Sequence, residues 1–357
     1  MALILTNEEI ENLLDIQDYL SALEAMYFDY AQGEAKEPER VEVIVPQAPD
    51  KTYGFKSMTG VYPAKDVAAL RINSDMISWQ ERRVKLPLAP GERWVGLIFL
   101  FSLSQLKLLA IMQDGFMQRM RVGTTTALGA KYLARSNASV YGIIGTGWQA
   151  GAQIQAMAKV RPLRKIKVFS PNVEHRREFA REWRDKLGID VLAVDTVREA
   201  VIGSDIVGCA TNSLEPVIKG EWLSAGMHVT CIRPVELDRS VLERADVCFI
   251  HNLFKGSQIR PSQEIVKKEL LSEHINESLK GKRNDDINKW GLMPQLADMI
   301  GGMVPGRRDD QQITCFVNNA GIALQFAAVG ALAYKKACEK GIGNELPDHW
   351  FTQNVHP

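Results

Sequence analysis

The chain has 357 residues, of which 46% are hydrophobic and 24% are charged, and its 43 basic side chains are balanced by 43 acidic ones. This length predicts two domains, and the composition excludes a disordered chain, a collagen-like repeat and a small disulfide-built protein. The zero net charge argues against a general nucleic-acid-binding protein, which needs a basic surplus to contact phosphates.

The N-terminal third predicts a helix followed by an antiparallel sheet. Its first residues have no signal-peptide pattern. Residues 6–31 carry apolar side chains at helical spacing, and Thr6 with Glu9 forms a capping-box pattern. Short runs rich in Val, Ile and aromatic residues follow, separated by prolines, and they predict strands over 41–45, 52–58, 67–72 and 94–101.

The middle of the chain predicts a parallel sheet with helices on both faces. After a small-residue helix over 117–134, strand and helix patterns alternate, as a doubly wound Rossmann fold requires. The polar, lysine-rich stretch 252–294 shows a helical pattern only around 261–271, and an apolar helix over 318–339 ends before Gly341. The predicted strands are 140–144, 166–170, 191–194, 206–210, 228–232 and 247–250.

A glycine-rich turn between the strand 140–144 and the next helix carries the clearest chemical signal. Gly145 permits a tight turn, Gly147 lets backbone N–H groups approach a pyrophosphate, and Ala150 allows close packing of helix on strand. We therefore predict a dinucleotide site that includes Thr146, Trp148 and Gln149. The alternative is a Rossmann-like turn that binds nothing.

The end of the next strand, 166–170, favours NADP(H) over NAD(H). An NAD site usually has a carboxylate there for the ribose hydroxyls, whereas this chain has Ser170 and Asn172, with Arg176 or Arg177 nearby to pair with a 2′-phosphate. The alternative is that Arg176 and its neighbour Arg177 decorate a solvated helix. Further cofactor contacts are predicted at the carboxyl edge of the sheet, from Thr211, Asn212, Ser213 and Cys231.

Seven stretches in chain order resemble the ornithine cyclodeaminase/μ-crystallin family. They are QDG (113–115), RMRVG (119–123), KYLAR (131–135), ATNS (210–213), EPVIKG (215–220), AGMHV (225–229) and PGRRDD through IT to GIALQ (305–325). The resemblance implies a homodimer whose substrate-binding and dimerisation domain, residues 1–118 and 312–357, is interrupted by a Rossmann domain, residues 119–311. It also implies hydride transfer between a nicotinamide and the α-carbon of a small amino or imino acid.

The same resemblance places the substrate carboxylate on Arg40 and Arg121 and the family's lysine at Lys56. Bidentate guanidinium groups fix a planar carboxylate, and Lys56 can bond the carboxylate or move a proton at the reacting nitrogen. Asp114 is either a substrate-side residue or a structural member of an Asp-Gly turn in which Gly115 has positive φ. A polar cluster over 71–75 and the aromatic side chains Trp79 and Trp94 belong to the same region.

One departure from the family pattern makes ornithine cyclisation doubtful. Cyclodeaminases have an aspartate shortly after the strand equivalent to 228–232, whereas this chain offers only Glu236 as a substitute. We therefore expect reduction of an imine next to a carboxylate, or amine oxidation. The alternatives are a cyclodeaminase with recycled NAD and a crystallin-like dimer that binds small molecules without chemistry.

The remaining patterns predict a cytoplasmic protein with no metal, membrane or nucleic-acid partner. No apolar stretch approaches the roughly 20 residues of a membrane span. The five cysteines form no C-x-x-C pair and no zinc-like spacing with histidine, so we interpret them as small hydrophobic residues in a reducing compartment.

Overall fold

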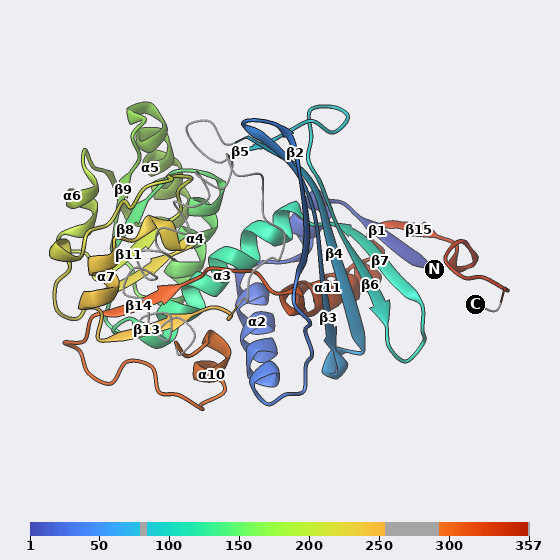
Figure 1. Ribbon diagram of the computed structural model, residues 1–357. Coiled ribbons are helices and arrows are strands. Elements are labelled where there is room, and N and C mark those ends of the chain that lie inside the picture. Colours follow the sequence, from blue (N-terminus) through green and yellow to red (C-terminus); the bar gives the residue numbers. More distant parts are fainter. Residues whose placement is uncertain (79–83, 254–292, 356–357) are drawn as a thin grey trace.

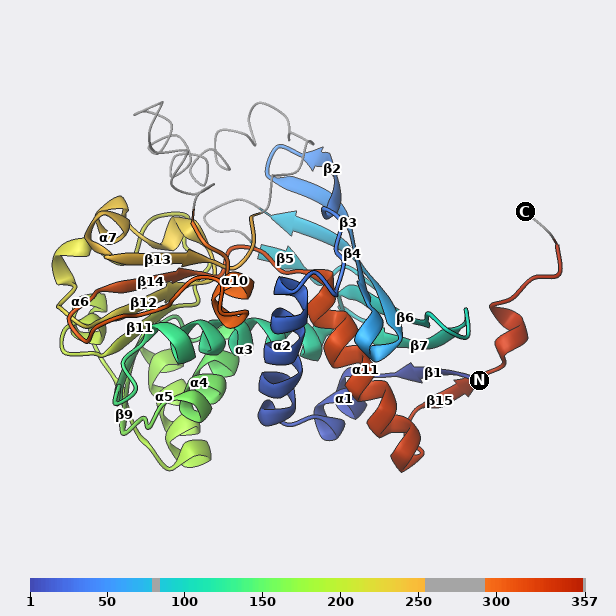
Figure 2. The same ribbon diagram turned by 90° about the horizontal axis from the view of Figure 1, so that it is seen from below.

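A computed structural model describes residues 1–78, 84–253 and 293–355, which fold into two lobes lying side by side (Figure 1). Both termini lie at the far end of the outer lobe, which carries the first strands of the chain (Figure 2). The other lobe carries the glycine-rich turn after residues 140–144 and is called the nucleotide-binding lobe, after the site that the sequence predicts there. The helical pattern around 261–271 and the predicted pocket residue Trp79 fall outside the described residues.

The outer lobe is built on an eight-stranded sheet in the order β15-β1-β7-β6-β4-β3-β2, with β5 paired to β4. Its pairs are antiparallel except that β1 runs parallel to β7. The strands predicted over 41–45, 52–58, 67–72 and 94–101 are confirmed, and three of them run longer than predicted. The bounds are β1 Ala2–Leu5, β2 Val41–Ala48, β3 Lys51–Tyr62, β4 Val67–Ser78, β5 Val84–Leu86, β6 Val95–Ser102, β7 Leu108–Gln113 and β15 Asn344–Leu346.

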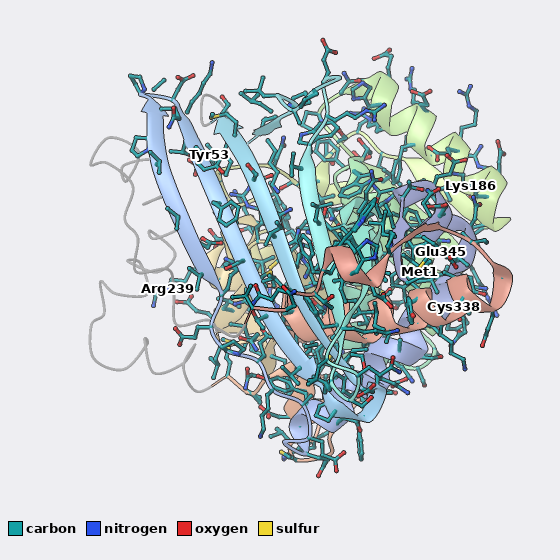
Figure 3. All side chains as sticks on the ribbon, turned by 90° about the vertical axis from the view of Figure 1, so that its right-hand side faces the viewer. Met1, Tyr53, Lys186, Arg239, Cys338 and Glu345 are labelled. Atoms are coloured by element: carbon teal, nitrogen blue, oxygen red, sulfur yellow. The ribbon has the colours of Figure 1, made fainter. Side chains whose placement is uncertain are left out.

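Helices cover one face of this sheet, and Figure 3 looks onto the other face, where Tyr53 marks β3. The single helix predicted over 6–31 is wrong: the chain forms α1, Asn7–Leu13, and α2, Ile16–Ala31. The Thr6 capping box is confirmed, but Asp15 starts a new helix because its carboxylate accepts from the Asp18 N–H and Asp18 reciprocates. The long helix α11, Ala323–Lys340, packs on β3 and β4 and ends at Gly341 with φ 62°.

The nucleotide-binding lobe contains a seven-stranded parallel sheet in the order β10-β9-β8-β11-β12-β14-β13. All the strands predicted here are confirmed, whereas β14 was not predicted and comes from the range 312–357 that we had assigned to the outer domain. The bounds are β8 Val140–Ile144, β9 Lys165–Phe169, β10 Asp190–Ala193, β11 Ile206–Cys209, β12 His228–Cys231, β13 Val247–Ile250 and β14 Thr314–Val317.

The helix α3, Gly115–Leu133, connects the two lobes (Figure 1). It packs against α4, Trp148–Val160, so closely that a Cβ on Gly123 would lie 2.5 Å from the carbonyl carbon of Ala152. A side chain at this position would therefore force the two helices apart. The other α-helices between α4 and β14 in the described part of the chain are α5 Val173–Leu187, α6 Val197–Val201, α7 Arg239–Arg244 and α10 Leu296–Ile300, and α10 packs against α2.

Candidate functional site

The glycine-rich turn after β8 has the geometry that a pyrophosphate site requires. Gly145 has φ +110°, and a Cβ there would lie 2.2 Å from the carbonyl oxygen of Ala210, so only glycine fits. Gly147 differs, because it has φ −82° and a Cβ built on it would meet nothing within 4 Å. This open space lies at the N-terminus of α4, where backbone N–H groups and the helix dipole favour an anion.

The turn lies at the point where the strand order reverses, since β8 is flanked by β9 on one side and β11 on the other. Ligands of open α/β sheets bind at this position, beyond the carboxyl ends of the strands. The predicted cofactor residues of this turn and of the loop after β11 therefore gather at one edge, and all of them are at least partly accessible: Thr146, Trp148, Gln149, Thr211, Asn212 and Ser213.

Glu236 fixes the loops at this edge and is not available as a catalytic carboxylate. It is fully buried, and one oxygen accepts from the backbone and hydroxyl of Thr211 at 2.6 and 2.8 Å. The other accepts from the N–H groups of Ile232 and Arg233 at 3.0 and 2.9 Å. Burial raises the pKa of Glu236, while these donors act against the rise. The side chain thus ties the loop after β11 to the loop after β12.

At the end of β9 the residues chosen for the adenosine ribose are already engaged with the protein. The Asn172 side chain caps α5 by accepting from the His175 N–H at 2.9 Å. Arg176 is buried, donates to the Ser170 carbonyl at 3.0 Å and forms an ion pair with Asp195. Cys231 is fully buried in the apolar core around β12, and its thiol lies close to the Arg233 N–H and the Glu236 carboxylate.

Arg121 is the central side chain of the second half of the site. It lies on α3 at 6% exposure, in space left by Gly321, where a Cβ would approach its Nη1 to 2.2 Å. Its guanidinium donates to the Gln118 and Gln325 side-chain oxygens at 2.6 and 3.0 Å. No ion pair joins Arg121 to a carboxylate of the described residues. Burial lowers the pKa of Arg121, and Arg71 and Arg40 lower it further.

Asp114 has a structural role beside Arg121. Its Oδ2 accepts from Arg71 Nε at 2.7 Å and Nη2 at 2.6 Å, and from Asn73 at 3.1 Å. The predicted positive φ at Gly115 is wrong, because Gly115 is the first residue of α3 and has no positive φ. Arg71 and Asn73, part of the polar cluster over 71–75, face the helix-covered side of β4 and hold Asp114 there.

Arg40, directly before β2, and Lys56 of β3 share one carboxylate. Glu42 Oε1 lies 2.7 Å from Arg40 Nη2 and 3.4 Å from Lys56 Nζ, and Glu42 pairs with Lys56 across the sheet. The structure thus brings together two of the three basic side chains that the resemblance assigns to the substrate. Among the described residues, Arg71 pairs with Asp114, Arg40 and Lys56 share Glu42, and Arg121 has no ion pair, so these four cations outnumber the nearby carboxylates Glu37, Glu42 and Asp114.

Two residues, Asn318 and Arg119, connect helix α3, which carries Arg121, to the carboxyl edge of the parallel sheet. Asn318 follows β14 and donates to the Val122 carbonyl and the Thr126 hydroxyl of α3 at 3.2 and 3.0 Å. Arg119, one turn from Val122, lies 5.8 Å from the Trp148 ring of α4. Arg121 is therefore held between the carboxyl edge of the parallel sheet and the helix-covered face of the outer sheet.

Sequence reasoning missed several polar residues of this region. Gln325 lies in a stretch that carries the family resemblance, but nothing in its spacing indicated a contact with Arg121. Glu37 lies three residues before Arg40, and its carboxylate accepts from the Leu324 N–H at 3.2 Å. Burial raises its pKa to about 8, with backbone donors and the charges of Arg121 and Arg40 acting against the rise. Glu42 was not predicted as a site residue because it lies within a run that predicts only a strand.

A groove of about 620 Å³ lies elsewhere, between α2, α11 and the loops at the other end of the outer sheet. None of the predicted site residues lines it. Among the described residues no cluster of His, Cys, Asp and Glu could hold a metal ion. No helix in the described part of the chain is long and apolar enough to cross a bilayer.

The fold is that of a two-lobed protein with a Rossmann-type parallel sheet in one lobe and a buried cluster of basic side chains in the other. The chain belongs to the ornithine cyclodeaminase/mu-crystallin family, whose model matches residues 1–341. The predicted family and fold class are thereby confirmed.

Curated and solved relatives match along most of the chain. An alanine dehydrogenase of Archaeoglobus fulgidus is 27% identical over 96% of this chain and 98% of its own length. A ketimine reductase mu-crystallin of Macropus fuliginosus is 22% identical over 92% of this chain and 96% of its own. The solved Thermococcus litoralis Δ1-pyrroline-2-carboxylate reductase with NADH and L-proline is 27% identical, with a TM-score of 0.77 over 96% of this chain and 100% of that one.

Proposed function

We propose that the protein is a nicotinamide-dependent oxidoreductase that reduces a C=N bond next to a carboxylate or oxidises the corresponding amine. The observation that carries the proposal is Arg121, a buried guanidinium with no carboxylate partner among the described residues. A buried charge is costly unless it is paired, so the site favours a ligand that brings a carboxylate. The named activities of the reductase relatives support this assignment.

The residues at the sheet edge fit a dinucleotide. The open space above Gly147 leaves room for a pyrophosphate, and Gly145, Thr146 and the first turn of α4 would hold it. A bound nicotinamide would supply or accept hydride. Arg121, with Arg40 and Lys56, would orient the substrate carboxylate, and Lys56 Nζ would bond that carboxylate or pass a proton to the substrate nitrogen.

We infer that NADP(H) is preferred to NAD(H). No carboxylate directly follows β9, where Ser170 and Asn172 stand, and the Arg176 guanidinium is fixed against the Ser170 carbonyl. A 2′-phosphate at this point would meet a positive charge and no repelling group except Asp195, which is largely exposed. Competition between NADPH and NADH in a direct titration tests the preference, and tighter binding of NADH contradicts it.

We also propose a homodimer that forms through the uncovered face of the outer sheet. Apolar side chains on this face are exposed, including Val41 at 58%, Val43 at 43% and Phe55 at 39%. An apolar surface of this kind is a typical interface between copies. The solved archaeal alanine dehydrogenase is described as a dimer. We expect Val43→Glu with Phe55→Glu to give monomers in sedimentation velocity, while dimers of the double variant would contradict the interface.

The cyclodeaminase alternative is less favoured because both oxygens of Glu236 are committed to the loops. The purified protein should be assayed with NADPH and a panel of cyclic imino acids, α-keto acids with amines, and ornithine. Net nicotinamide oxidation with an imine next to a carboxylate is the expected result. Ammonia release without net oxidation would indicate the cyclodeaminase, and binding without turnover would indicate a crystallin-like protein.

Arg121→Met should lower kcat/KM by roughly 100-fold, because a buried charged hydrogen-bonding partner of the carboxylate is lost. Arg121→Lys serves as the matched variant: it keeps the charge but loses the planar fork, so it should recover only part of the activity. NADPH affinity should stay within about twofold in both, because this side chain does not contact the dinucleotide edge. Unchanged turnover in Arg121→Met would contradict the assignment.

A further inference from the structure

A chain of buried polar side chains leads away from Arg121 and ends in the nucleotide-binding lobe. Its members are Gln325 of α11, Thr125 of α3, Tyr27 of α2 and His251, which follows β13. Each is at most 2% exposed. The proposed reaction uses none of them directly, and three separate helices and the residue after β13 contribute one member each.

The first contact fixes the protonation of His251. Its Nδ1 faces the carbonyl oxygen of Ala320, which can only accept, so Nδ1 carries the proton. Its Nε2 then accepts from the Tyr27 hydroxyl, 2.6 Å away. Burial lowers the pKa of His251 to about 3, which keeps the ring neutral. Tyr27 therefore has no proton left to donate toward α11.

The second contact fixes the amide of Gln325. Its Nε2 donates to the Tyr27 oxygen at 2.8 Å and to the Thr125 hydroxyl at 2.7 Å. Thr125 in turn donates its proton to the Arg121 carbonyl at 2.8 Å. The Gln325 Oε1 is thereby turned to the other side, where it accepts from the Ile322 N–H at 3.1 Å and from Arg121 Nη1 at 3.0 Å.

The Thr125 hydroxyl lies 2.8 Å from the Arg121 carbonyl oxygen and 3.1 Å from the Tyr27 oxygen. The protons of His251, Tyr27 and the Gln325 amide have the acceptors given above, so the orientation of each of these groups determines the next. We propose that His251, Tyr27 and Gln325 are positioning residues, which hold the Arg121 guanidinium at the angle that receives the substrate carboxylate. This inference rests on the proposed function of Arg121. Because His251 belongs to the nucleotide-binding lobe, the chain also makes the direction of the guanidinium depend on how the two lobes meet.

The test compares Tyr27→Phe with Tyr62→Phe. Tyr62 is also buried, and its hydroxyl donates to Asp29 of the same helix α2 at 2.6 Å, but it does not contact the chain that leads to Arg121. We expect Tyr27→Phe to weaken carboxylate-substrate binding by about tenfold while NADPH affinity stays within about twofold. Tyr62→Phe should change neither. Equal effects of the two variants on carboxylate binding would overturn the proposal.

Two histidine variants add a readout that a merely structural role would not give. In His251→Gln the amide oxygen reaches the place of Nε2 and still accepts from Tyr27, whereas the shorter side chain of His251→Asn reaches only the place of Nδ1. We expect His251→Gln to keep most of the carboxylate affinity and His251→Asn to lose it to the same extent as Tyr27→Phe. Equal losses in the two histidine variants would contradict the directional chain.

A double-mutant cycle tests the chain without any substrate. In the contacts described, Tyr27 and Arg121 are connected only through Gln325 and Thr125. If this chain of hydrogen bonds couples them, the change in the free energy of unfolding of the double variant Tyr27→Phe/Arg121→Met should differ from the sum of the two single changes. Additive effects would overturn the positioning role. If the cycle is coupled but the wild-type protein binds no carboxylate, the proposed function fails and the chain itself stands.

Discussion

The nucleotide-binding half and the substrate half of the site differ in the groups that they offer a ligand: backbone groups in the first and charged side chains in the second. At the sheet edge the ligand would meet backbone, because Gly145, Gly147 and the start of α4 shape the space and Glu236 ties the loops from behind. In the substrate half the ligand would meet charged side chains, such as Arg121 of α3 and Lys56 of β3, which come from distant segments. The backbone half depends on local conformation, and the side-chain half depends on pairing of buried charges.

The largest effect is expected in the side-chain half. Arg71→Met should lower the free energy of unfolding by about 3–5 kcal/mol, because it leaves the Asp114 carboxylate buried without its cation. The exposed pair of Lys186 with Glu182 is the control, and Lys186→Met should cost no more than about 0.5 kcal/mol. Chemical denaturation measures both. Similar small losses in both variants would show that Asp114 does not depend on Arg71.

In the nucleotide-binding half, substitutions at Gly147 and Gly145 should have different effects, the first on NADPH binding and the second on the free energy of unfolding. Gly147→Val has space for its side chain but fills the place of the pyrophosphate, so we expect roughly 100-fold weaker NADPH binding, about 2.7 kcal/mol, with little change in unfolding. Gly145→Ala instead meets the Ala210 carbonyl at positive φ and should destabilise the fold by about 1–3 kcal/mol. Calorimetric titration and thermal unfolding distinguish them. Normal NADPH binding by Gly147→Val would exclude this cradle.

The two halves should also respond oppositely to pH. Burial lowers the pKa of His228, in the parallel sheet, to about 3, so unfolding takes up a proton and stability falls as the pH drops below about 6.5, by at most about 1.4 kcal/mol per unit. Glu37 has a pKa raised to about 8, so its contribution is present below about 4.5 and is lost as the pH rises through 8. Glu37 is half-buried, which makes its limb shallower.

Unfolding curves measured across this pH range test both limbs. His228→Gln should remove about half of the acid limb, because the pKa of His251 is also lowered to about 3 and contributes a similar share. Glu37→Gln should flatten the alkaline limb without affecting the acid one. An alkaline limb that is unchanged in Glu37→Gln would show that another group in the outer half is responsible.

The smallest effect is expected at the cofactor ribose. Asp195→Asn removes the carboxylate that holds Arg176, so the guanidinium becomes freer to meet a 2′-phosphate. Because Asp195 is 82% exposed, the pair is weak, and we expect NADPH affinity to rise by no more than about fivefold relative to NADH. The ratio of the two dissociation constants measures this. A fall in the NADPH preference would contradict our placement of Arg176.

The backbone half could be predicted from the sequence because its signals are local. Apolar runs gave the strands β8 to β13, and the glycine spacing gave the turn, since φ and Cβ clashes are properties of a few consecutive residues. The strand β14 was missed because it lies more than sixty residues after β13 and yet inserts beside it. A single helix over 6–31 was expected because the apolar spacing continues through Asp15, whose capping role competes with that pattern.

The side-chain half could be predicted only in part. Arg40, Lys56 and Arg121 came from the family resemblance, whereas their partners depend on which side chains face each other across the assembled lobe. Glu42 contacts Lys56 only because of the register of β2 and β3, and Gln325 reaches Arg121 from the far end of the chain. Tyr27 was interpreted as one of several core residues of a helix, because an apolar stripe does not reveal what a hydroxyl contacts.

The close approach of Gly123 to Ala152 sets a fixed spacing within the molecule. Arg121 stands two residues before this contact on α3, and the phosphate turn opens α4 on the other side of it. The distance between a substrate carboxylate bound by Arg121 and a nicotinamide ring bound at the turn would therefore depend on the contact between the backbones of α3 and α4. Helices packed this closely have little freedom to move along each other. Substitutions on the outer strands could then alter which molecules are accepted while the gap that a hydride must cross stays the same.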